Sequence, residues 1–535
     1  MAGQTKYIVI TGSVMSGLGK GIFSASLGKV LEDYGFNCSP IKFDGYLNYD
    51  AGTLNPYRHG EVFVLDDGTE GDMDLGTYER FLDKNLTKDN YLTGGKIFTR
   101  VLSLERKGKF LGRDVQFLPH VTGEIKHFLR VLAVKTKADI VMVEVGGTVG
   151  DIENEYFIEA MRQLAFEEGK DNCCFVNVTY ILEPGFLGEQ KSKAAQLGIK
   201  RLMELGIQPD IIACRASNPV TEKVREKIAI YSNVQFDRVV SVHDCESIYT
   251  IPRLLVESKI DSAVFDILSL APKLQKGRVK AWNDFEKKIG ECTKKVTVGI
   301  TGKYTGLRDS YASIIKSLEH AGVHNGVEVD IKWIETTRIE TAEDAEKALR
   351  GVQGIIVPGG FGKRGAEGKI ACVEYARKNR IPYLGLCFGF QMALIEFARN
   401  VCGLKDANST EVEPLTKEPV IDILPEQKKI EGLGGNMRLG GRDVVIKKDT
   451  LAYKLYGRRM IRERFRHRYE CNPKYISALE AKGLVFSGKA PDQPIMQILE
   501  LPDHPFYVGV QFHPEFTSRP LKTNPLYMGF LKAIG

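Results

Sequence analysis

The sequence predicts an α/β protein made of two domains in series, the first of them built on a P-loop-like, mostly parallel sheet. Short apolar runs rich in β-branched residues alternate with helical patterns, which is typical of a parallel sheet covered by helices. A glycine-rich segment follows the first run, and a second series of runs begins beyond the middle of the chain. The length of 535 residues also exceeds what one ordinary core accommodates.

The expected elements follow from these runs in chain order. In the first half we expect a helix over 22–34 and strands over 6–11, 139–145, 174–182 and 210–214. Residues 266–295 are richer in lysine and other polar residues, so we interpret them as a linker that carries one helix. Further strands are expected over 296–302, 354–360 and 382–387. The predicted division is a domain at 1–268, a linker at 269–294 and a domain at 295–535.

Composition excludes several classes of protein. The hydrophobic and charged fractions, 43% and 27%, are those of a soluble globular protein. We find no apolar run of about 18 residues and no signal-peptide layout, so we expect neither membrane association nor export. The net charge of +6 is small for this length and argues against a nucleic-acid partner. Ten scattered cysteines without a CxxC pair argue against zinc and fit a reducing cytoplasm.

The glycine-rich segment after the first strand has the character of a phosphate-binding loop. Its sequence, TGSVMSGLGKG over 11–21, offers backbone N–H groups and a helix N-terminus to phosphate oxygens, with Lys20 as a point charge. It departs from the strict P-loop pattern because Val14 replaces the first glycine and Gly21 replaces the serine or threonine. A plain glycine-rich turn between strand and helix is the alternative interpretation.

Acidic residues near this loop indicate a Mg²⁺ site. Lys42 and Asp44 follow the next strand, Asp72 and Asp74 lie in GDMDLG, and Glu144 ends an apolar strand. A carboxylate at the carboxyl end of a buried strand beside a P-loop is well placed to hold Mg²⁺. A solvated acidic turn is the alternative for Asp72 and Asp74, whereas a carboxylate in a run as apolar as that of Glu144 needs a partner or an ion.

The second half contains the pattern of a nucleophile elbow with a thiol at its apex. In PYLGLCFGFQ, Cys387 follows an apolar strand, is flanked by small residues and precedes a helix, which favours the thiolate. His513 in QFHPE is the candidate base, and Glu515 can orient its imidazole. The Gly359–Gly360 pair and the N–H after Cys387 are candidate oxyanion donors.

Each of these residues has a structural alternative. A lone cysteine is more often a small buried hydrophobe, and a lone histidine is more often structural. The elbow, the HPE segment and the PGG turn nevertheless occur in one predicted domain. Their combination favours acyl transfer by a Cys-His-Glu triad.

With these motifs in place, the chain resembles the CTP synthase family over nearly its whole length. VPGGFG, GLCFGFQ and QFHPEF are similar to the class I glutamine amidotransferase domain, an α/β domain. Six further segments are similar to the synthetase domain of the family: SGLGKG (16–21), HGEVFVLDDG (59–68), DLGTYERFL (74–82), LTKDN (86–90), GGTVGDIE (146–153) and QPDI (208–211).

The resemblance implies site residues for each substrate. ATP would contact Gly17, Leu18, Gly19, Lys20, Gly21, Ile22, Lys42, Asp74, His243, Asp244 and Cys245. UTP, or the product CTP, would contact Ser16, Asp151, Ile152, Glu153, Lys191, Ser192, Lys193, Ala194, Ala195, Gln196 and Lys227. Glutamine would be held by Gly360, Phe388, Gly389, Phe390, Gln391, Glu411 and Arg468. The triad would be Cys387, His513 and Glu515, Mg²⁺ would be held by Asp74 and Glu144, and ammonia would pass Pro56, His59 and Val62.

The implied reaction explains why one chain carries both sites. The C4 oxygen of UTP is a poor leaving group, so ATP first phosphorylates it, and ammonia released from glutamine then displaces the phosphate. The products are CTP, ADP, phosphate and glutamate. The resemblance further implies Mg²⁺ as cofactor, GTP as allosteric activator, CTP as feedback inhibitor, a homotetramer and a cytoplasmic location.

Three departures from the family pattern bear on these expectations. Gly45 stands where a proline is usual, which should spare Lys42 and Asp44. The loop at 191–196 is KSKAAQ, whereas the family usually has KTKPTQ, so the charges remain while a proline and a hydroxyl are lost. The segment 425–433 is shorter than the basic stretch that many members link to GTP activation.

Two other functions fit parts of the sequence. An ATP-dependent amidoligase that amidates a carboxylate would share both halves, although the KSKAAQ loop and HGEVF argue against it. A catalytically inactive, self-assembling regulatory homologue would bind nucleotides without turnover. The presence of the candidate thiol, base, phosphate lysine and metal carboxylates argues against that alternative.

Overall fold

The computed structural model divides the chain into two compact units, and it describes residues 4–185, 188–303, 306–423, 437–491 and 493–535. The first unit comprises 1–53 and 74–286, and the second comprises 54–73 and 287–535. These units differ from the predicted division in two respects: residues 54–73 belong to the second unit, and the predicted linker at 269–294 is divided between the two units after residue 286. No helix among the described residues is long and apolar enough to span a bilayer.

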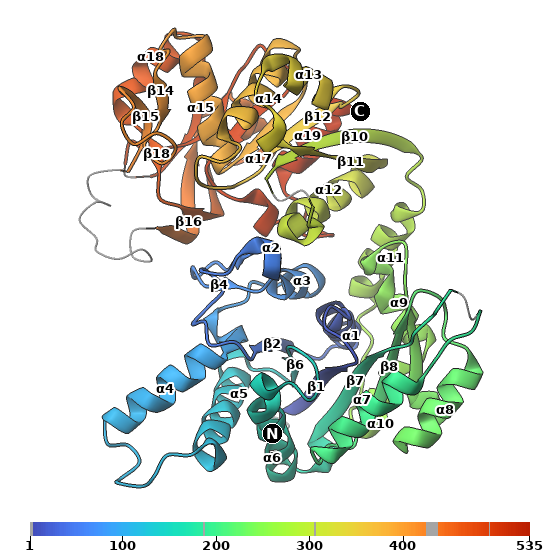
Figure 1. The fold of residues 1–535 in the computed structure, drawn as a ribbon. Coiled ribbons are helices and arrows are strands. Elements are labelled where there is room, and N and C mark those ends of the chain that lie inside the picture. Colours follow the sequence, from blue (N-terminus) through green and yellow to red (C-terminus); the bar gives the residue numbers. More distant parts are fainter. Residues whose placement is uncertain (1–3, 186–187, 304–305, 424–436, 492) are drawn as a thin grey trace. The chain divides into compact units, whose positions relative to one another are not determined.

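The first unit is a seven-stranded sheet in the order β5-β2-β6-β1-β7-β8-β9, and every neighbouring pair is parallel (Figure 1). Its strands are β1 (Lys6–Ser13), β2 (Cys38–Asp44), β5 (Tyr91–Thr93), β6 (Ile140–Val145), β7 (Cys173–Tyr180), β8 (Ile211–Ala216) and β9 (Val239–His243). The apolar runs predicted to be strands in the first half of the chain are therefore confirmed. Such runs form interior strands because both faces of the sheet are covered.

Helices cover both faces of this sheet. They are α1 (Lys20–Asp33), α3 (Met73–Leu82), α4 (Gly94–Arg106), α5 (Thr122–Thr136), α6 (Glu155–Glu168), α7 (Lys193–Glu204), α8 (Glu222–Ser232), α9 (Ile251–Glu257), α10 (Ile260–Ile267) and α11 (Lys276–Ile289). Alternate residues of β1 enter two cores, since Tyr7 and Val9 pack with α5 and α6 while Ile8 and Ile10 pack with α1. This alternation is the period of two expected of a strand.

Helix α11 is the helix predicted within the linker, and it packs on the first unit. Trp282 and Phe285 are its buried residues, and both rings contact Tyr249. The indole N–H of Trp282 donates to the backbone carbonyl of Tyr249 at 3.1 Å.

The second unit contains a nine-stranded mixed sheet in the order β11-β10-β12-β13-β21-β20-β19-β16-β17. The first five strands, β11 (Val327–Glu335), β10 (Lys294–Gly302), β12 (Gly354–Val357), β13 (Tyr383–Leu386) and β21 (Tyr507–Val510), are parallel. The other four, β20 (Met496–Glu500), β19 (Val485–Lys489), β16 (Arg438–Ile446) and β17 (Met460–His467), are antiparallel. A small sheet contains β14 (Ala407–Ser409), β15 (Glu418–Asp422) and β18 (Glu470–Cys471).

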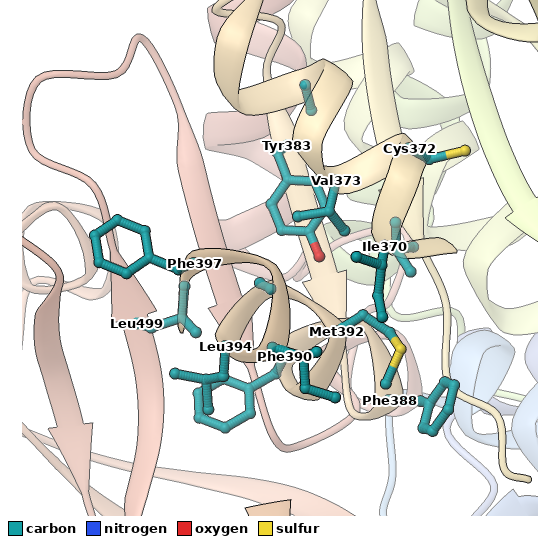
Figure 2. Packing of buried hydrophobic residues seen from close by; sticks show 14 of the residues in the cluster. Ile370, Cys372, Val373, Tyr383, Phe388, Phe390, Met392, Leu394, Phe397 and Leu499 are labelled. Atoms are coloured by element: carbon teal, nitrogen blue, oxygen red, sulfur yellow. The ribbon is translucent and has the colours of Figure 1, made fainter. Parts of the chain in front are cut away.

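The α-helices described within residues 287–535 that follow α11 are α12 (Ala312–Asn325), α13 (Ala342–Leu349), α14 (Ala366–Lys378), α15 (Phe388–Asn400), α17 (Leu451–Tyr456), α18 (Ile476–Glu480) and α19 (Pro525–Ile534). Residues of α14 and α15 meet in one of the two main cores of this unit. Figure 2 shows Ile370 and Val373 of α14 close to Phe388 and Met392 of α15 and Tyr383 of β13.

Residues 54–73 form helix α2 (Pro56–His59) and the hairpin β3 (Phe63–Val64) and β4 (Glu70–Gly71). The guanidinium of Arg464 on β17 donates to the Val64 carbonyl at 3.1 Å, and the next inward residue, Arg466, pairs with Glu70 at 2.6 Å. Phe63 packs edge-on against Phe516. These contacts attach the segment to the second unit, because a two-stranded hairpin does not hold itself together.

Candidate active sites

The loop between β1 and α1 brings Lys20 to the carboxyl edge of the first sheet. Its side chain is buried, and Nζ donates to the Gly147 carbonyl at 2.6 Å. Burial lowers the pKa of Lys20, and the nearby Lys42 lowers it further. Gly12 leaves room for it, since a Cβ at that position would lie 2.8 Å from the lysine Nζ and would displace the ammonium. The ammonium is thereby held next to the loop that the sequence predicts to bind phosphate.

A buried ionic cluster lies beside Lys20. Nζ of Lys42 is 2.5 Å from Oδ2 of Asp74 and 2.8 Å from Oε1 of Glu144, and the hydroxyl of Tyr78 donates to Oε2 of Glu144. Burial raises the pKa of Glu144. The charge of Lys42 opposes this rise, whereas the charge of Asp74 adds to it. The two carboxylates predicted to hold Mg²⁺ are therefore brought together around one lysine.

Two residues that depart from the P-loop pattern have structural explanations. Val14 adopts φ = 82°, the left-handed backbone that the missing glycine would favour. At Gly21 a Cβ would overlap the carboxylate of Asp74, so the absence of serine or threonine there makes room for that acid.

A cavity of about 170 Å³ opens beside the phosphate loop. Its lining includes residues 17–19 and Ile22 from the loop, together with His243, Asp244 and Cys245 after β9. The two segments predicted to contact ATP thus share one cavity, although they are more than 200 residues apart in the chain. Arg215 also lines it and pairs with Asp244; sequence reasoning missed this residue because it belongs to no motif.

The residues predicted to contact the pyrimidine nucleotide are only partly gathered. The turn before Asp151 meets the phosphate loop, where the N–H of Val149 donates to the Gly12 carbonyl at 2.8 Å. Ile152 is exposed, and Asp151 accepts from the N–H of Thr148 at 2.8 Å. The remaining predicted residue of this turn, Glu153, lies in a short 3₁₀ helix.

The 191–196 loop leads into α7, which begins at Lys193. Gln196 donates to Oγ of Ser192 at 3.1 Å, and Lys191 pairs with Glu189. Glu189, whose pKa is lowered first by its hydrogen bond to Lys191, also lies in the field of Lys227 on α8. Of the three predicted lysines, Lys191 thus pairs with this exposed carboxylate, and Lys227 is close enough for its charge to act on it.

In the second unit, Cys387 occupies a strained turn between β13 and α15. Its φ of 50° and ψ of −96° are unusual for a residue other than glycine, and only 4% of its surface is exposed. A Cβ at Gly389 would overlap the Val357 carbonyl, and one at Gly385 would overlap the Tyr383 hydroxyl. The small residues around the thiol are thus required by the elbow itself.

His513 and Glu515 form the rest of the predicted triad. Nδ1 of His513 lies 2.7 Å from Oε1 of Glu515, and the imidazole stacks on the Phe516 ring. Burial opposes the protonated imidazole, but the charges of Glu515 and then Cys387 prevail and raise the pKa of His513 to about 10. This is the arrangement of a base that is oriented by a carboxylate and faces a thiol.

The thiol, the imidazole and the PGG turn line one cavity of about 110 Å³. A Cβ at Gly359 would lie 2.9 Å from Cε1 of His513, so this turn passes directly beside the triad. Pro56 and Val62, two of the three residues predicted on the ammonia route, line the same cavity. The third, His59, is exposed on α2 and is not part of the described lining.

Only one of the residues predicted to hold glutamine belongs to the described lining of this cavity. Gly360 lies in its lining, and the N–H of Gly362 donates to Glu411 at 2.9 Å. Burial raises the pKa of Glu411, and the charge of Arg468 is among those that oppose this rise. The side chain of Phe390 instead lies in the hydrophobic core, as Figure 2 shows.

Gln511 is a residue near the thiol to which sequence reasoning assigned no role. Its amide donates to Sγ of Cys387 at 3.6 Å, and its carbonyl oxygen accepts from Gln391 at 3.3 Å. Its position in QFHPE, two residues before His513, is the sequence feature that could have indicated a role near the thiol. The short segment 425–433 lies outside the described residues.

Comparisons with known proteins show which families the chain resembles. A family model described as the CTP synthase N-terminus matches residues 6–270, and one for class-I glutamine amidotransferases matches residues 307–533. The CTP synthase of Pyrococcus furiosus is 51% identical over 531 residues, which cover 99% of this chain and 98% of that protein. The CTP synthase of Saccharolobus solfataricus is 48% identical over 532 residues, with 99% of each chain covered.

Among solved structures, the glutaminase domain of Trypanosoma brucei CTPS with bound acivicin is 38% identical. The match covers 45% of this chain and 93% of that chain, with a TM-score of 0.43.

Proposed function

This chain belongs to the CTP synthase family, and from that premise we propose which of its residues carry each step of the reaction. The enzyme consumes ATP, UTP and L-glutamine and produces CTP, ADP, phosphate and glutamate. We assign glutamine hydrolysis to the second unit and CTP formation to the first, and the residues matched by the two family models support this assignment. The observation that carries the assignment of residues is the arrangement of Cys387, His513 and Glu515 around one cavity in a chain that also holds a buried phosphate lysine.

In the second unit, Cys387 is proposed to attack the side-chain amide carbon of glutamine. His513 takes the thiol proton and delivers it to the departing ammonia, while Glu515 keeps Nδ1 of the imidazole oriented. The thioester on Cys387 is then hydrolysed by water. The turn at Gly359 and Gly360 and the N–H of Phe388 are the candidate donors to the oxygen that becomes negative in both steps.

The charges near the cavity match the ends of a free amino acid. Glu411 suits the α-ammonium group of glutamine, and Arg468 suits its α-carboxylate. Gly360 and the residues at 388–391 would then enclose the amide end. Released ammonia is proposed to leave past Pro56 and Val62, with His59 further along its route.

In the first unit, Lys20 and Lys42 are proposed to bind the phosphoryl group that passes from ATP to the C4 oxygen of UTP. The cavity with His243, Asp244 and Cys245 would take the adenine end of ATP. Phosphoryl transfer depends mainly on such positioning and on charge stabilisation. Asp44 stays a candidate member of this cluster.

The two acidic side chains of this cluster fit Mg²⁺. Glu144 offers oxygen ligands near the end of a parallel strand, and Asp74 offers them beside it, on the other side of Lys42. Mg²⁺ is usually held by one or two carboxylates plus substrate phosphates. When bound, the ion supplies positive charge to the phosphate oxygens. The residues of this chain orient those phosphates and, through Lys42, hold the carboxylates in place.

We propose UTP binding, and feedback inhibition by CTP, at residues 16, 151–153, 191–196 and 227. The charged groups among them suit a triphosphate, whereas the alanines at 194 and 195 offer no hydroxyl. A homotetramer would bring such residues together from several chains. GTP activation and a cytoplasmic location are further proposals, the latter supported by ten free cysteines.

The test is to incubate the protein with UTP, ATP and Mg²⁺, supply either glutamine or ammonia, and measure CTP with and without GTP. We expect CTP from both nitrogen sources. A catalytically inactive homologue would form CTP from neither. An amidoligase of another kind would hydrolyse ATP only when a carboxylate substrate replaces UTP.

A further inference from the structure

Lys369 is a buried lysine for which the reaction steps above give no role. It lies in the first turn of α14 and only 4% of its surface is exposed. No carboxylate among the described residues forms an ion pair with it. Placing a lone ammonium in the interior is costly, so its retention calls for a compensating interaction.

The ammonium of Lys369 lies near both segments that carry candidate oxyanion donors, the PGG turn and the residue after Cys387. Nζ donates to the Pro358 carbonyl at 3.0 Å, at the start of the PGG turn. A Cβ at Gly360 would lie 3.3 Å from Nζ, so the ammonium is directly against that residue. Nζ also lies 5.3 Å from the ring centre of Phe388, the residue after the nucleophile. One side chain therefore touches the two segments that carry the candidate donors.

The charge environment is consistent with a role in catalysis. Burial, and then the neighbouring Lys303, lower the pKa of Lys369 to about 7, while Cys387 is the first group that opposes the shift. The Lys369 ammonium would thus be offset by negative charge on the thiolate of Cys387. It would equally be offset by negative charge on the oxygen of the amide group that Cys387 attacks. That charge is fully present when glutamine forms a tetrahedral intermediate.

We propose that Lys369 is a positioning residue of the glutaminase site: through the Pro358 carbonyl it holds the PGG turn with its N–H groups directed at the reacting carbonyl oxygen. The ammonium also favours negative charge on that oxygen. This proposal rests on the roles assigned above to Cys387 and the PGG turn. It adds a residue that acts on the transition state without touching glutamine.

The test compares Lys369→Met with Lys378→Met, an exposed lysine on the same helix that pairs with Glu374. For Lys369→Met we expect kcat of glutamine hydrolysis to fall about 10²-fold, as on loss of an oxyanion donor, with KM changed less than about twofold. CTP synthesis from added ammonia should be unchanged, and Lys378→Met should resemble the wild type. A raised KM with an unchanged kcat would overturn the proposal.

A second variant separates positioning from general damage to the fold. The amide of Lys369→Gln can still donate to the Pro358 carbonyl, so we expect it to recover part of the lost kcat. It also serves as the test if Lys369→Met does not fold. Equal activity of the two variants would exclude action through Pro358.

The affinity for a transition-state analogue distinguishes the proposed role of Lys369 from a merely structural one, which would leave that affinity unchanged. Glutamate γ-semialdehyde forms a tetrahedral adduct with the thiol, and its affinity should fall in Lys369→Met by the same factor as kcat. An unchanged affinity would refute the proposal. If instead Cys387→Ala kept glutamine-driven synthesis, the underlying site assignment would fail, and this outcome is distinct from a failure of Lys369 alone.

Discussion

The carboxylate of Asp74 fills the space that a side chain at position 21 would occupy. A Cβ added to Gly21 would overlap Oδ1 of Asp74, whose other oxygen pairs with Lys42 at 2.5 Å. A glycine at the first turn of α1 thus permits an acid to approach the phosphate loop.

The first prediction tests this relationship with Gly21→Ala. Displacing Asp74 should lower CTP synthesis from glutamine and from ammonia alike, by at least about tenfold, because both depend on phosphoryl transfer. Glutamine hydrolysis should persist. The control is Gly277→Ala in α11, where an added Cβ meets no atom within 4 Å. Loss of synthesis from glutamine only would contradict the assignment of Asp74.

The second prediction concerns the thiol. Cys387→Ala should abolish CTP synthesis from glutamine and leave synthesis from added ammonia nearly unchanged, because the nucleophile acts only on the amide. Cys372→Ala is the control, since that cysteine is buried in the core on α14. Loss of the ammonia-driven reaction in Cys387→Ala, with the fold intact by circular dichroism, would argue against two separate sites.

The third prediction follows from the raised pKa of His513. The pKa is about 10 in the folded protein and 6.5 as the ordinary value, so protonated His513 stabilises the native state below about pH 6.5. This contribution is lost as the pH rises from 6.5 to 10. The melting temperature of the wild type should therefore exceed that of His513→Gln most at pH 6.5 and least at pH 10. A gap that is independent of pH would contradict the shift.

The fourth prediction tests the backbone at Val14. A β-branched residue at φ = 82° is strained, so Val14→Gly should stabilise the protein or leave its stability unchanged, with a gain of up to about 1 kcal/mol. Val134→Gly is the matched control because Val134 is exposed and has helical backbone in the last turn of α5, and this change should cost up to about 1 kcal/mol. Chemical denaturation measures both. Equal losses would indicate that Val14 is not strained.

Much of this architecture could be predicted from the sequence because its signals are local. β1, β6 and β13 are continuous apolar runs, and the Cys387 elbow has a fixed spacing of small residues. The pairing of His513 with Glu515 also follows from their separation of two residues.

What could not be predicted depends on contacts between distant parts of the chain. Lys369 belongs to no motif, and only the fold places its ammonium against Pro358 and Phe388. Arg215 likewise reaches the nucleotide cavity through the order of β8 and β9. The membership of 54–73 in the second unit was missed because the segment lies within the sequence of the first.

That last feature limits how the polypeptide can be divided. The chain passes from one unit to the other after residues 53, 73 and 286, so one break after α11 does not yield two complete halves. A fragment that starts at 287 would lack the Val64 carbonyl and the Glu70 carboxylate that Arg464 and Arg466 engage. A glutaminase fragment of this chain that keeps every one of these contacts therefore has to carry residues 54–73 as well as 287–535.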